Sequence, residues 1–292
     1  MRMWAAKFKM SVATAGMTAL LWLLSSLTIP GPLQAAVYFD SNFETCAVGT
    51  GNDFPCEGWN DFGKEFINAP NHHKIEITNS RAFTGTKSVK ATYVNAVSGI
   101  DNPSIYHYFP LSDHIFARFA TIQSPGFVIA TNGNTKMVRF TASAGGFYPV
   151  ISVWHMYNKF TVGVEGAWTL GTVNFTGGPV PSSTKWDQVE IEIKLNTPGV
   201  SDGLVRLWVD GTLYIERLNL QLRGPTPTSI NGQGILNSSN FKYDTIQYFV
   251  QAGLGNKWMD RIAVGNTRIG LTTGQTSSDT SPPTIPSGVR AQ

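Results

Sequence analysis

The sequence predicts an all-β protein built as a sandwich of two antiparallel sheets. Charged residues make up only 14% of the chain, and aromatic residues make up 12%. Turn-forming Gly, Asn, Ser and Thr recur about every eight to twelve residues, which is typical of short strands joined by tight connections. Beyond residue 36 we find no apolar pattern with the period of a helix. Together these observations favour one large β-sandwich.

The clearest strands lie between residues 185 and 224. Apolar side chains alternate with polar ones from Trp186 to Leu195, which predicts a strand with one buried face. A second run, 204–209, leads into Asp210-Gly211, a pair that suits a two-residue hairpin turn because both positions tolerate positive φ. Residues 212–216 then return antiparallel to the second run.

The same reasoning along the rest of the chain predicts about fourteen strands in all. The remaining candidates are residues 37–39, 74–78, 88–93, 105–109, 115–121, 136–141, 150–154, 160–164, 168–173, 245–250 and 259–264. So many strands, spread over residues 37–271, predict one domain with a core of its own rather than a small binding module.

Residues 1–36 have the composition of a signal peptide. Arg2, Lys7 and Lys9 precede a long apolar stretch, and small residues follow it at Ala35 and Ala36. This order predicts cleavage after one of the two alanines. An uncleaved membrane anchor is the alternative, because the apolar stretch is long for a signal peptide. We expect a secreted or periplasmic protein with no membrane partner once the leader is removed.

The charge balance argues against a nucleic-acid partner. The chain has 22 Lys and Arg against 19 Asp and Glu, and its leader holds three of the basic residues and no acidic one. The mature chain therefore has no net formal charge, whereas a surface that follows phosphates needs a clustered basic excess. A local basic patch could still hold an anionic polysaccharide.

Cys46 and Cys56 are the only cysteines, and both follow the leader. In an exported protein two cysteines at short spacing predict a disulfide. It would close the loop around Gly49 and stabilise the fold by roughly 3 kcal/mol.

The C-terminal residues 272–292 differ from the rest in composition. They are rich in Ser, Thr and Gly, and then in Pro, from Ser281 to Pro286. This stretch resembles the linker and first strand that open fibronectin type III modules in secreted bacterial enzymes. It is far too short for such a domain, so we expect a disordered tail.

Several segments resemble the secreted concanavalin-A-like jelly rolls of the polysaccharide-lyase and laminin-G type. The three strands within residues 185–224 carry this likeness, and so do four strings in matching chain order. These are Phe39-Asp-Ser-Asn-Phe-Glu44, His114-Ile-Phe-Ala-Arg-Phe-Ala120 with Ser124-Pro-Gly126 after it, Thr135-Lys-Met-Val-Arg-Phe140, and Lys257-Trp-Met-Asp-Arg-Ile-Ala-Val264. The likeness covers most of residues 37–271 and implies a two-sheet antiparallel jelly-roll sandwich. None of the strings is a catalytic signature.

The resemblance implies a candidate reaction, the cleavage of an acidic, uronate-containing polysaccharide by β-elimination. Such a lyase needs a base, a donor that stabilises the charge developing on the carboxylate, and an acid for the leaving oxygen. The residues expected to supply these roles are Arg118, Arg139, His155, Tyr157, Gln247 and Tyr248. The Q-[IV]-H triplet of alginate lyases is missing, and Gln247-Tyr248 is at best a distant substitute for it.

Further residues are candidates for holding the polysaccharide or an ion. We expect Lys136, Trp154 and His107 to contact substrate, Trp154 by stacking on a sugar ring. Oxygen-bearing side chains near both ends of the domain predict a structural calcium, with Asp40, Asn42, Glu44 and Asp260 as ligands. Glu190 and Glu192 share the polar face of one strand, and we expect both to be solvated.

Two functions of different classes remain open on sequence alone. One is a polysaccharide lyase, favoured by the size of the sandwich. The other is a non-catalytic carbohydrate-binding or adhesive protein, favoured by the missing triplet and the module-like tail.

Overall fold

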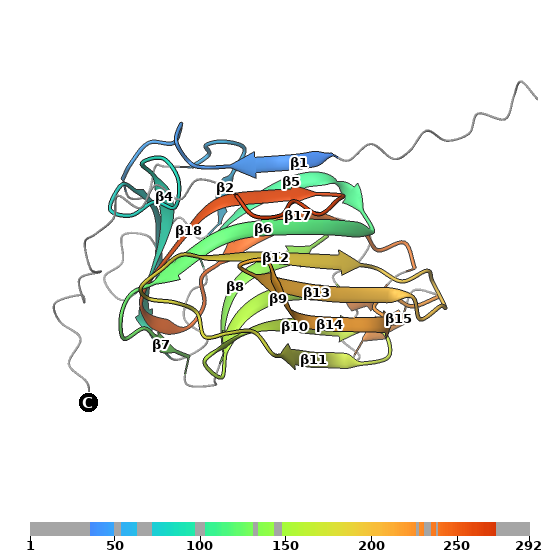
Figure 1. Cartoon of the computed structure of the whole chain (residues 1–292). Helices are drawn as coiled ribbons and strands as arrows, with labels where there is room; N and C mark the ends of the chain where they lie inside the picture. Colours follow the sequence, from blue (N-terminus) through green and yellow to red (C-terminus); the bar gives the residue numbers. More distant parts are fainter. Residues whose placement is uncertain are drawn as a thin grey trace, which may run out of the picture. The chain divides into compact units, whose positions relative to one another are not determined.

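The computed structural model confirms the predicted fold class, two packed antiparallel sheets without a helix in the part of the chain that it describes (Figure 1). The structure describes residues 36–49, 54–62, 72–96, 103–130, 134–142, 148–225, 228–230, 235–237 and 239–272. The predicted leader, except for Ala36, and the predicted tail, except for Thr272, lie outside the described residues. No helix among the described residues is long and apolar enough to cross a membrane.

The larger sheet has nine strands. Its main path runs β14-β13-β12-β6-β18-β4-β3, and β1 and β7 also pair with β18. The strands are β14 (Thr212–Leu220), β13 (Gly203–Val209), β12 (Asp187–Lys194), β6 (His114–Gln123), β18 (Gly253–Gly265), β4 (Ser88–Asn95), β3 (Lys74–Thr78), β1 (Val37–Ser41) and β7 (Val128–Ile129).

The second sheet has seven strands in the order β11-β10-β9-β8-β17-β5-β2. They are β11 (Gly171–Thr176), β10 (Lys159–Ala167), β9 (Val150–Met156), β8 (Asn134–Thr141), β17 (Tyr243–Phe249), β5 (Ser104–Ser112) and β2 (Asn60–Phe62). A separate hairpin pairs β15 (Thr228–Ile230) with β16 (Ile235–Asn237).

The core lies between the two sheets and follows from strand alternation. Val189, Ile191 and Ile193 of β12 are fully buried in the main apolar cluster. Phe160 and Val162 of β10 enter the same cluster from the other sheet. The period of two places every second residue of a strand on the outer face of its sheet. The candidate site residues must therefore be sorted both by sheet and by face.

A small second core covers part of the outer face of the nine-stranded sheet. Phe83, from the connection between β3 and β4, packs there with Trp186 and Trp258, and Ala120 and Ile122 of β6 complete the cluster. The end of the described chain crosses the same face over β12, where Thr272 donates its backbone N–H to Gln188. We call residues 266–272 the C-terminal strap.

The predicted strands agree with the structure at most positions. The predicted strand 74–78 coincides with β3, and the Asp210-Gly211 turn has φ values of 50° and 78°. The predicted strand 168–173 begins too early, because residues 168–170 form a turn before β11. The sequence analysis missed β2, β7, β15 and β16, which have two or three residues each and are too short to show an alternating pattern.

Candidate functional site

Polar side chains line up across the outer face of the seven-stranded sheet. Tyr106 of β5 is paired in register with Gln247 of β17, Gln247 with Arg139 of β8, and Arg139 with Ser152 of β9. The line continues through Gly163 of β10 to Asn174 of β11, and begins at Asn60 of β2. We call these seven positions the polar row. With about 4.8 Å between strands, the row spans about 29 Å, enough for an oligosaccharide lying across the sheet.

The side chains of this face are layered by depth. Arg139, Gln247 and Tyr106 are half-buried, whereas Ser152 and the neighbouring Thr161 are fully buried beneath them. The Ser152 and Thr161 hydroxyls and the Gln247 Oε1 atom have no hydrogen-bond partner in the described part of the chain. A buried polar atom without a partner costs about 1–3 kcal/mol. Of these three residues only Gln247, which is half-buried, lies within reach of a ligand on this face.

Trp154 and Lys136 form the neighbouring part of this face. The Trp154 ring lies against Gly163, where a Cβ atom would come within 2.5 Å of the ring, so a residue without a side chain is needed there. The Lys136 ammonium sits 5.3 Å from the centre of the Trp154 ring and 2.6 Å from a Glu165 oxygen. Both predicted binding residues therefore lie next to the polar row, although Trp154 is buried under the Lys136 side chain.

Charged side chains of this face lie close to Glu165. Burial lowers the pKa of the Arg139 guanidinium, and the nearby Glu165 and Tyr148 oppose that shift. Since Glu165 also pairs with Lys136, the two cations share one carboxylate.

Sequence reasoning missed Tyr106, Ser152 and Glu165. Strand alternation puts Tyr106 and Tyr108 on the face of β5 opposite His107, the residue that was expected to contact substrate, and nothing in the local sequence joins Tyr106 to Arg139. The signal that joins them is the register between β5, β17 and β8, which brings together residues about 110 to 140 positions apart in the chain. Register between distant strands is not visible in a single sequence.

The structure does not bring Arg118 to this site. Arg118 lies on β6, in the nine-stranded sheet, and its side chain faces outward under the C-terminal strap. It donates to the Gly270 carbonyl at 3.3 Å and lies 3.8 Å from Asp40. The sequence analysis grouped it with Arg139 because both interrupt apolar strands, but the two arginines belong to different sheets.

His155 faces the interior and cannot reach a ligand on the outer face. It is 1% exposed, and its Nδ1 atom accepts a hydrogen bond of 3.3 Å from the buried Lys257 ammonium. Burial and the Lys257 charge lower the pKa of His155 to about 2, and burial lowers the pKa of Lys257 to about 7. Trp154, its neighbour in β9, necessarily faces the opposite way. The assignment of His155 as a groove base is therefore corrected.

Tyr248, Tyr157 and His107 also lie away from the polar row. Tyr248 is fully buried in the core, and burial raises its pKa well above the usual value. Tyr157 sits at the tip of the β9–β10 hairpin, 65% exposed and about 16 Å along the strand from Ser152. His107 faces inward, stacked on Phe39 with 3.7 Å between ring centres. Alternation in β5 thus turns His107 away from the face that Tyr106 and Tyr108 share.

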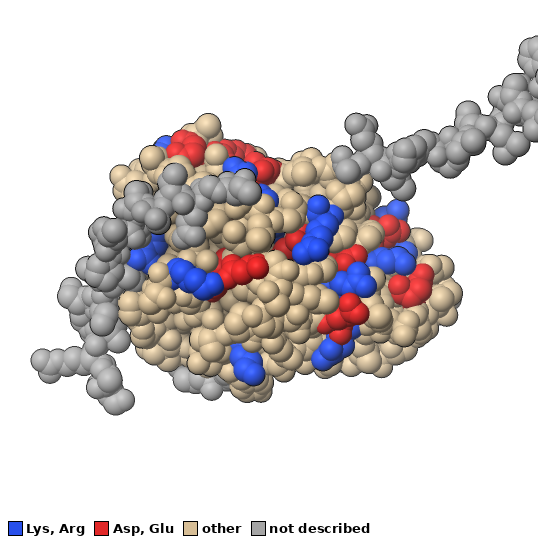
Figure 2. Space-filling view, viewed as in Figure 1, with Lys and Arg blue, Asp and Glu red and all other residues tan. Residues whose placement is uncertain are grey.

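Glu190 and Glu192 are buried rather than solvated. Glu190 accepts the backbone N–H groups of Ile269 at 2.7 Å and Gly270 at 3.1 Å, and so holds the C-terminal strap on β12. Glu192 accepts hydrogen bonds from His114 at 2.8 Å and Arg206 at 3.1 Å. Figure 2 shows that positive and negative side chains lie next to one another on the face in view.

The four residues expected to bind calcium have partners of their own in the protein. The Asp260 carboxylate accepts the backbone N–H groups of Phe83 and Thr84, and Asp40 pairs with Arg261 at 3.2 Å. Asn42 accepts the backbone N–H of Glu44. The described residues contain no group of three or more His, Cys, Asp or Glu side chains arranged to hold a metal ion. The calcium therefore stays a prediction, without a converging ligand set.

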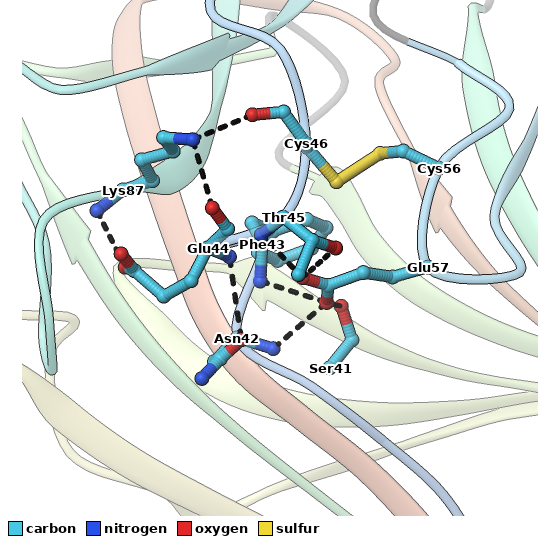
Figure 3. The surroundings of a disulfide bond; sticks show 9 residues. All are labelled: Ser41, Asn42, Phe43, Glu44, Thr45, Cys46, Cys56, Glu57 and Lys87. Atoms are coloured by element: carbon cyan, nitrogen blue, oxygen red, sulfur yellow. Dashed lines mark hydrogen bonds between the residues drawn. A yellow bond between two sulfur atoms is a disulfide. The ribbon is translucent and has the colours of Figure 1, made fainter.

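The loop around Glu44 contains a cation of its own. The Glu44 carboxylate accepts hydrogen bonds from Thr86 and from the Lys87 backbone, and the Lys87 ammonium donates to the carbonyls of Glu44 at 2.8 Å and Cys46 at 2.7 Å (Figure 3). A lysine thus occupies a pair of carbonyls that a metal cation could otherwise bind.

The predicted disulfide between Cys46 and Cys56 is present, with Cα atoms 5.4 Å apart. Next to it, the Glu57 carboxylate accepts three backbone N–H groups, those of Asn42, Phe43 and Thr45, and the hydroxyls of Ser41 and Thr45 (Figure 3). These hydrogen bonds lower the pKa of Glu57 against the opposing effect of its burial. The disulfide and this carboxylate together fix the loop, so the cysteines have a structural role.

No family model and no curated protein matches the sequence, whereas solved structures do match the fold. An endo-β-1,4-glucuronan lyase from Trichoderma reesei is 16% identical, with a TM-score of 0.52 over 80% of this chain and 96% of the other. A variant of an alginate lyase, solved with an alginate trisaccharide, is 11% identical, with a TM-score of 0.53 over 79% and 98%. The globular domain of T. cruzi calreticulin is 10% identical, with a TM-score of 0.51 over 80% and 89%. These identities show a shared fold, the concanavalin A-like jelly-roll sandwich.

Proposed function

We propose that this protein is a secreted polysaccharide lyase that cleaves an acidic, uronate-containing glycan on the outer face of the seven-stranded sheet. The observation that carries the proposal is the adjacency of Tyr106, Gln247 and Arg139 in one row across three paired strands. The structural likeness to a glucuronan lyase and an alginate lyase supports a polysaccharide as the substrate. The disulfide supports export to an oxidising compartment.

The three side chains have complementary roles in this mechanism. The Arg139 guanidinium and the Gln247 amide bind the uronate carboxylate and stabilise the negative charge that spreads onto it when the α-proton leaves. Side chains on paired strands at matching positions are about 5 Å apart, so one carboxylate can contact both.

Tyr106 is the residue we assign to proton transfer. Its phenolate form takes the proton next to the carboxylate, the electron pair forms the new carbon–carbon double bond, and the glycosidic carbon–oxygen bond breaks. We assign protonation of the leaving oxygen to Lys136, which lies next to the row with its side-chain nitrogen 2.6 Å from a Glu165 oxygen. The products are an unsaturated uronate end and a free hydroxyl end.

The test is turnover on a panel of glucuronan, alginate, pectate and glycosaminoglycans, followed by the ultraviolet absorbance of the unsaturated product. Absorbance should rise on at least one polymer, Tyr106→Phe should abolish the rise, and Tyr108→Phe is the matched control. Tyr108 lies two residues along the same strand, is 53% exposed and pairs with Thr245 rather than Gln247. No rise on any polymer, or equal losses in the two variants, would refute the assignment.

A non-catalytic carbohydrate-binding protein is the second candidate. One observation favours it: no histidine among the described residues lies in the polar row. Retention of an acidic glycan in a gel, without any absorbance change across the panel, would establish binding instead of cleavage.

A further inference from the structure

A pocket of about 430 Å³ lies apart from the polar row, where the β11–β12 connection passes the β13–β14 hairpin. Its walls include Pro179, Val180 and Ser183 from the connection, Asp187 at the start of β12, and Tyr214 from β14. None of its lining residues belongs to the polar row or contacts Lys136 or Trp154, so it is a separate site.

The walls of the pocket are fixed by hydrogen bonds. The Asp187 carboxylate accepts the Ser182 backbone N–H at 2.6 Å, and the Asp210 carboxylate accepts the Gln188 backbone N–H at 2.9 Å. On the other side, Phe160 of β10 donates its N–H to the Pro179 carbonyl at 2.9 Å. A ligand would therefore meet a preformed pocket, which lowers the entropy cost of binding.

The charges of the pocket disfavour an acidic ligand. Lys185 forms an ion pair with Asp210, and its ammonium is 3.7 Å from an Asp187 oxygen. Two carboxylates therefore face one ammonium, which leaves no surplus positive charge for a uronate. This differs from the polar row, where two cations share Glu165. Carboxylates already held in place can accept hydrogen bonds from neutral hydroxyl groups.

The rest of the lining combines an aromatic ring, aliphatic groups and hydroxyls. Tyr214 is 44% exposed and Val180 is 52% exposed, and two prolines continue their apolar surface. The hydroxyl groups of Ser183, Thr184 and Thr212 line the same space. An aromatic side chain packs against the C–H face of a sugar, while hydroxyls and carboxylates bind the ring oxygens and hydroxyls.

We propose that this pocket is a second glycan-binding site, which takes an uncharged, hydroxyl-rich hexose unit. It would hold the protein to a neutral polysaccharide while the polar row faces a different, acidic one. The proposal does not depend on lyase activity, because the two sites share no residue.

The test measures binding of cellohexaose, laminarihexaose and mannohexaose to the secreted protein by isothermal titration calorimetry. At least one should bind with a Kd below about 1 mM. Tyr214→Ala should weaken that binding about tenfold, as expected for losing one aromatic contact. Val180→Arg, which fills the pocket from an exposed position, provides a second variant. Thermal unfolding of each variant verifies that it folds.

Two controls separate this pocket from other surfaces. Leu218→Ala removes another exposed apolar side chain from β14, outside the pocket, and should leave binding unchanged. Arg139→Ala should also leave it unchanged, because Arg139 belongs to the polar row. The proposal is overturned if none of the three oligosaccharides binds, if Leu218→Ala matches Tyr214→Ala, or if Arg139→Ala removes the binding.

Discussion

The outer faces of the two sheets both carry charged and polar side chains, but the side chains have different partners. On the nine-stranded sheet, Glu190 holds the C-terminal strap and Glu192 binds His114 and Arg206. On the seven-stranded sheet, Ser152 and the Gln247 oxygen lie in the polar row without partners among the described residues. Residue type alone would not separate the two faces. Polar groups that the chain pairs with itself stabilise it, and converging polar groups that it leaves unpaired indicate a place for a ligand.

The largest expected effect contrasts two arginines. Arg139→Ala should lower turnover on the acidic glycan by about 100-fold or more, because it removes a donor to the developing charge. Arg118→Ala should leave turnover unchanged and lower the free energy of unfolding by about 1–3 kcal/mol, because Gly270 and Asp40 lose their partner. Steady-state kinetics and urea unfolding measure the two effects. Loss of turnover in Arg118→Ala, with Arg139→Ala unaffected, would reverse the assignment of the faces.

The second effect tests the strap. Glu190→Ala should lower the free energy of unfolding by about 2–4 kcal/mol, because it leaves two strap N–H groups without an acceptor. Glu216→Ala, which breaks a half-exposed ion pair with Arg206 on the same sheet, should cost about 1 kcal/mol or less. Chemical denaturation compares the two. Equal decreases in the free energy of unfolding would mean that the hydrogen bonds between the strap and Glu190 add nothing to stability.

The third effect is a pH dependence of the free energy of unfolding. It arises from His155, which lies in the interior and not on either outer face. The pKa of His155 is about 2 in the fold, against 6.5 when unperturbed. Between these values the unfolded chain binds a proton that the folded chain does not, so stability falls as the pH drops from 6.5 towards 2. His155→Gln should flatten this part of the curve, as measured by urea unfolding at several pH values. An unchanged slope would mean that His155 is not held neutral in the interior.

The smallest expected effect concerns calcium. A chelator should leave the melting temperature unchanged, because Glu44 and Asp260 already accept hydrogen bonds from backbone N–H groups. Differential scanning calorimetry with and without chelator measures this. A lower melting temperature that added calcium restores would support the predicted ligand set instead.

Alternation and turn residues allowed the fold class and most strands to be predicted. The disulfide was predicted separately, from two cysteines at short spacing in an exported chain. Alternation also separates the two sides of a strand, so Trp154 and His155 could have been assigned to opposite faces from their adjacency alone. It does not reveal which sheet a strand joins, and for this reason Arg118 and Arg139 were grouped together. The polar row depends on pairing between strands far apart in the chain, which local sequence does not encode. Glu190 was expected to be solvated because the strap that covers it comes about eighty residues later.

Lys87 gives the loop around Cys46 a cation attached to the chain. The Lys87 ammonium is attached to the chain and donates to the Glu44 and Cys46 carbonyls. Its effective concentration at these carbonyls is therefore set by the length of the lysine side chain and not by the surrounding solution. Dilution cannot remove this ammonium, and neither can a polymer that binds free divalent ions. This part of the protein should therefore keep its shape where free divalent ions are scarce.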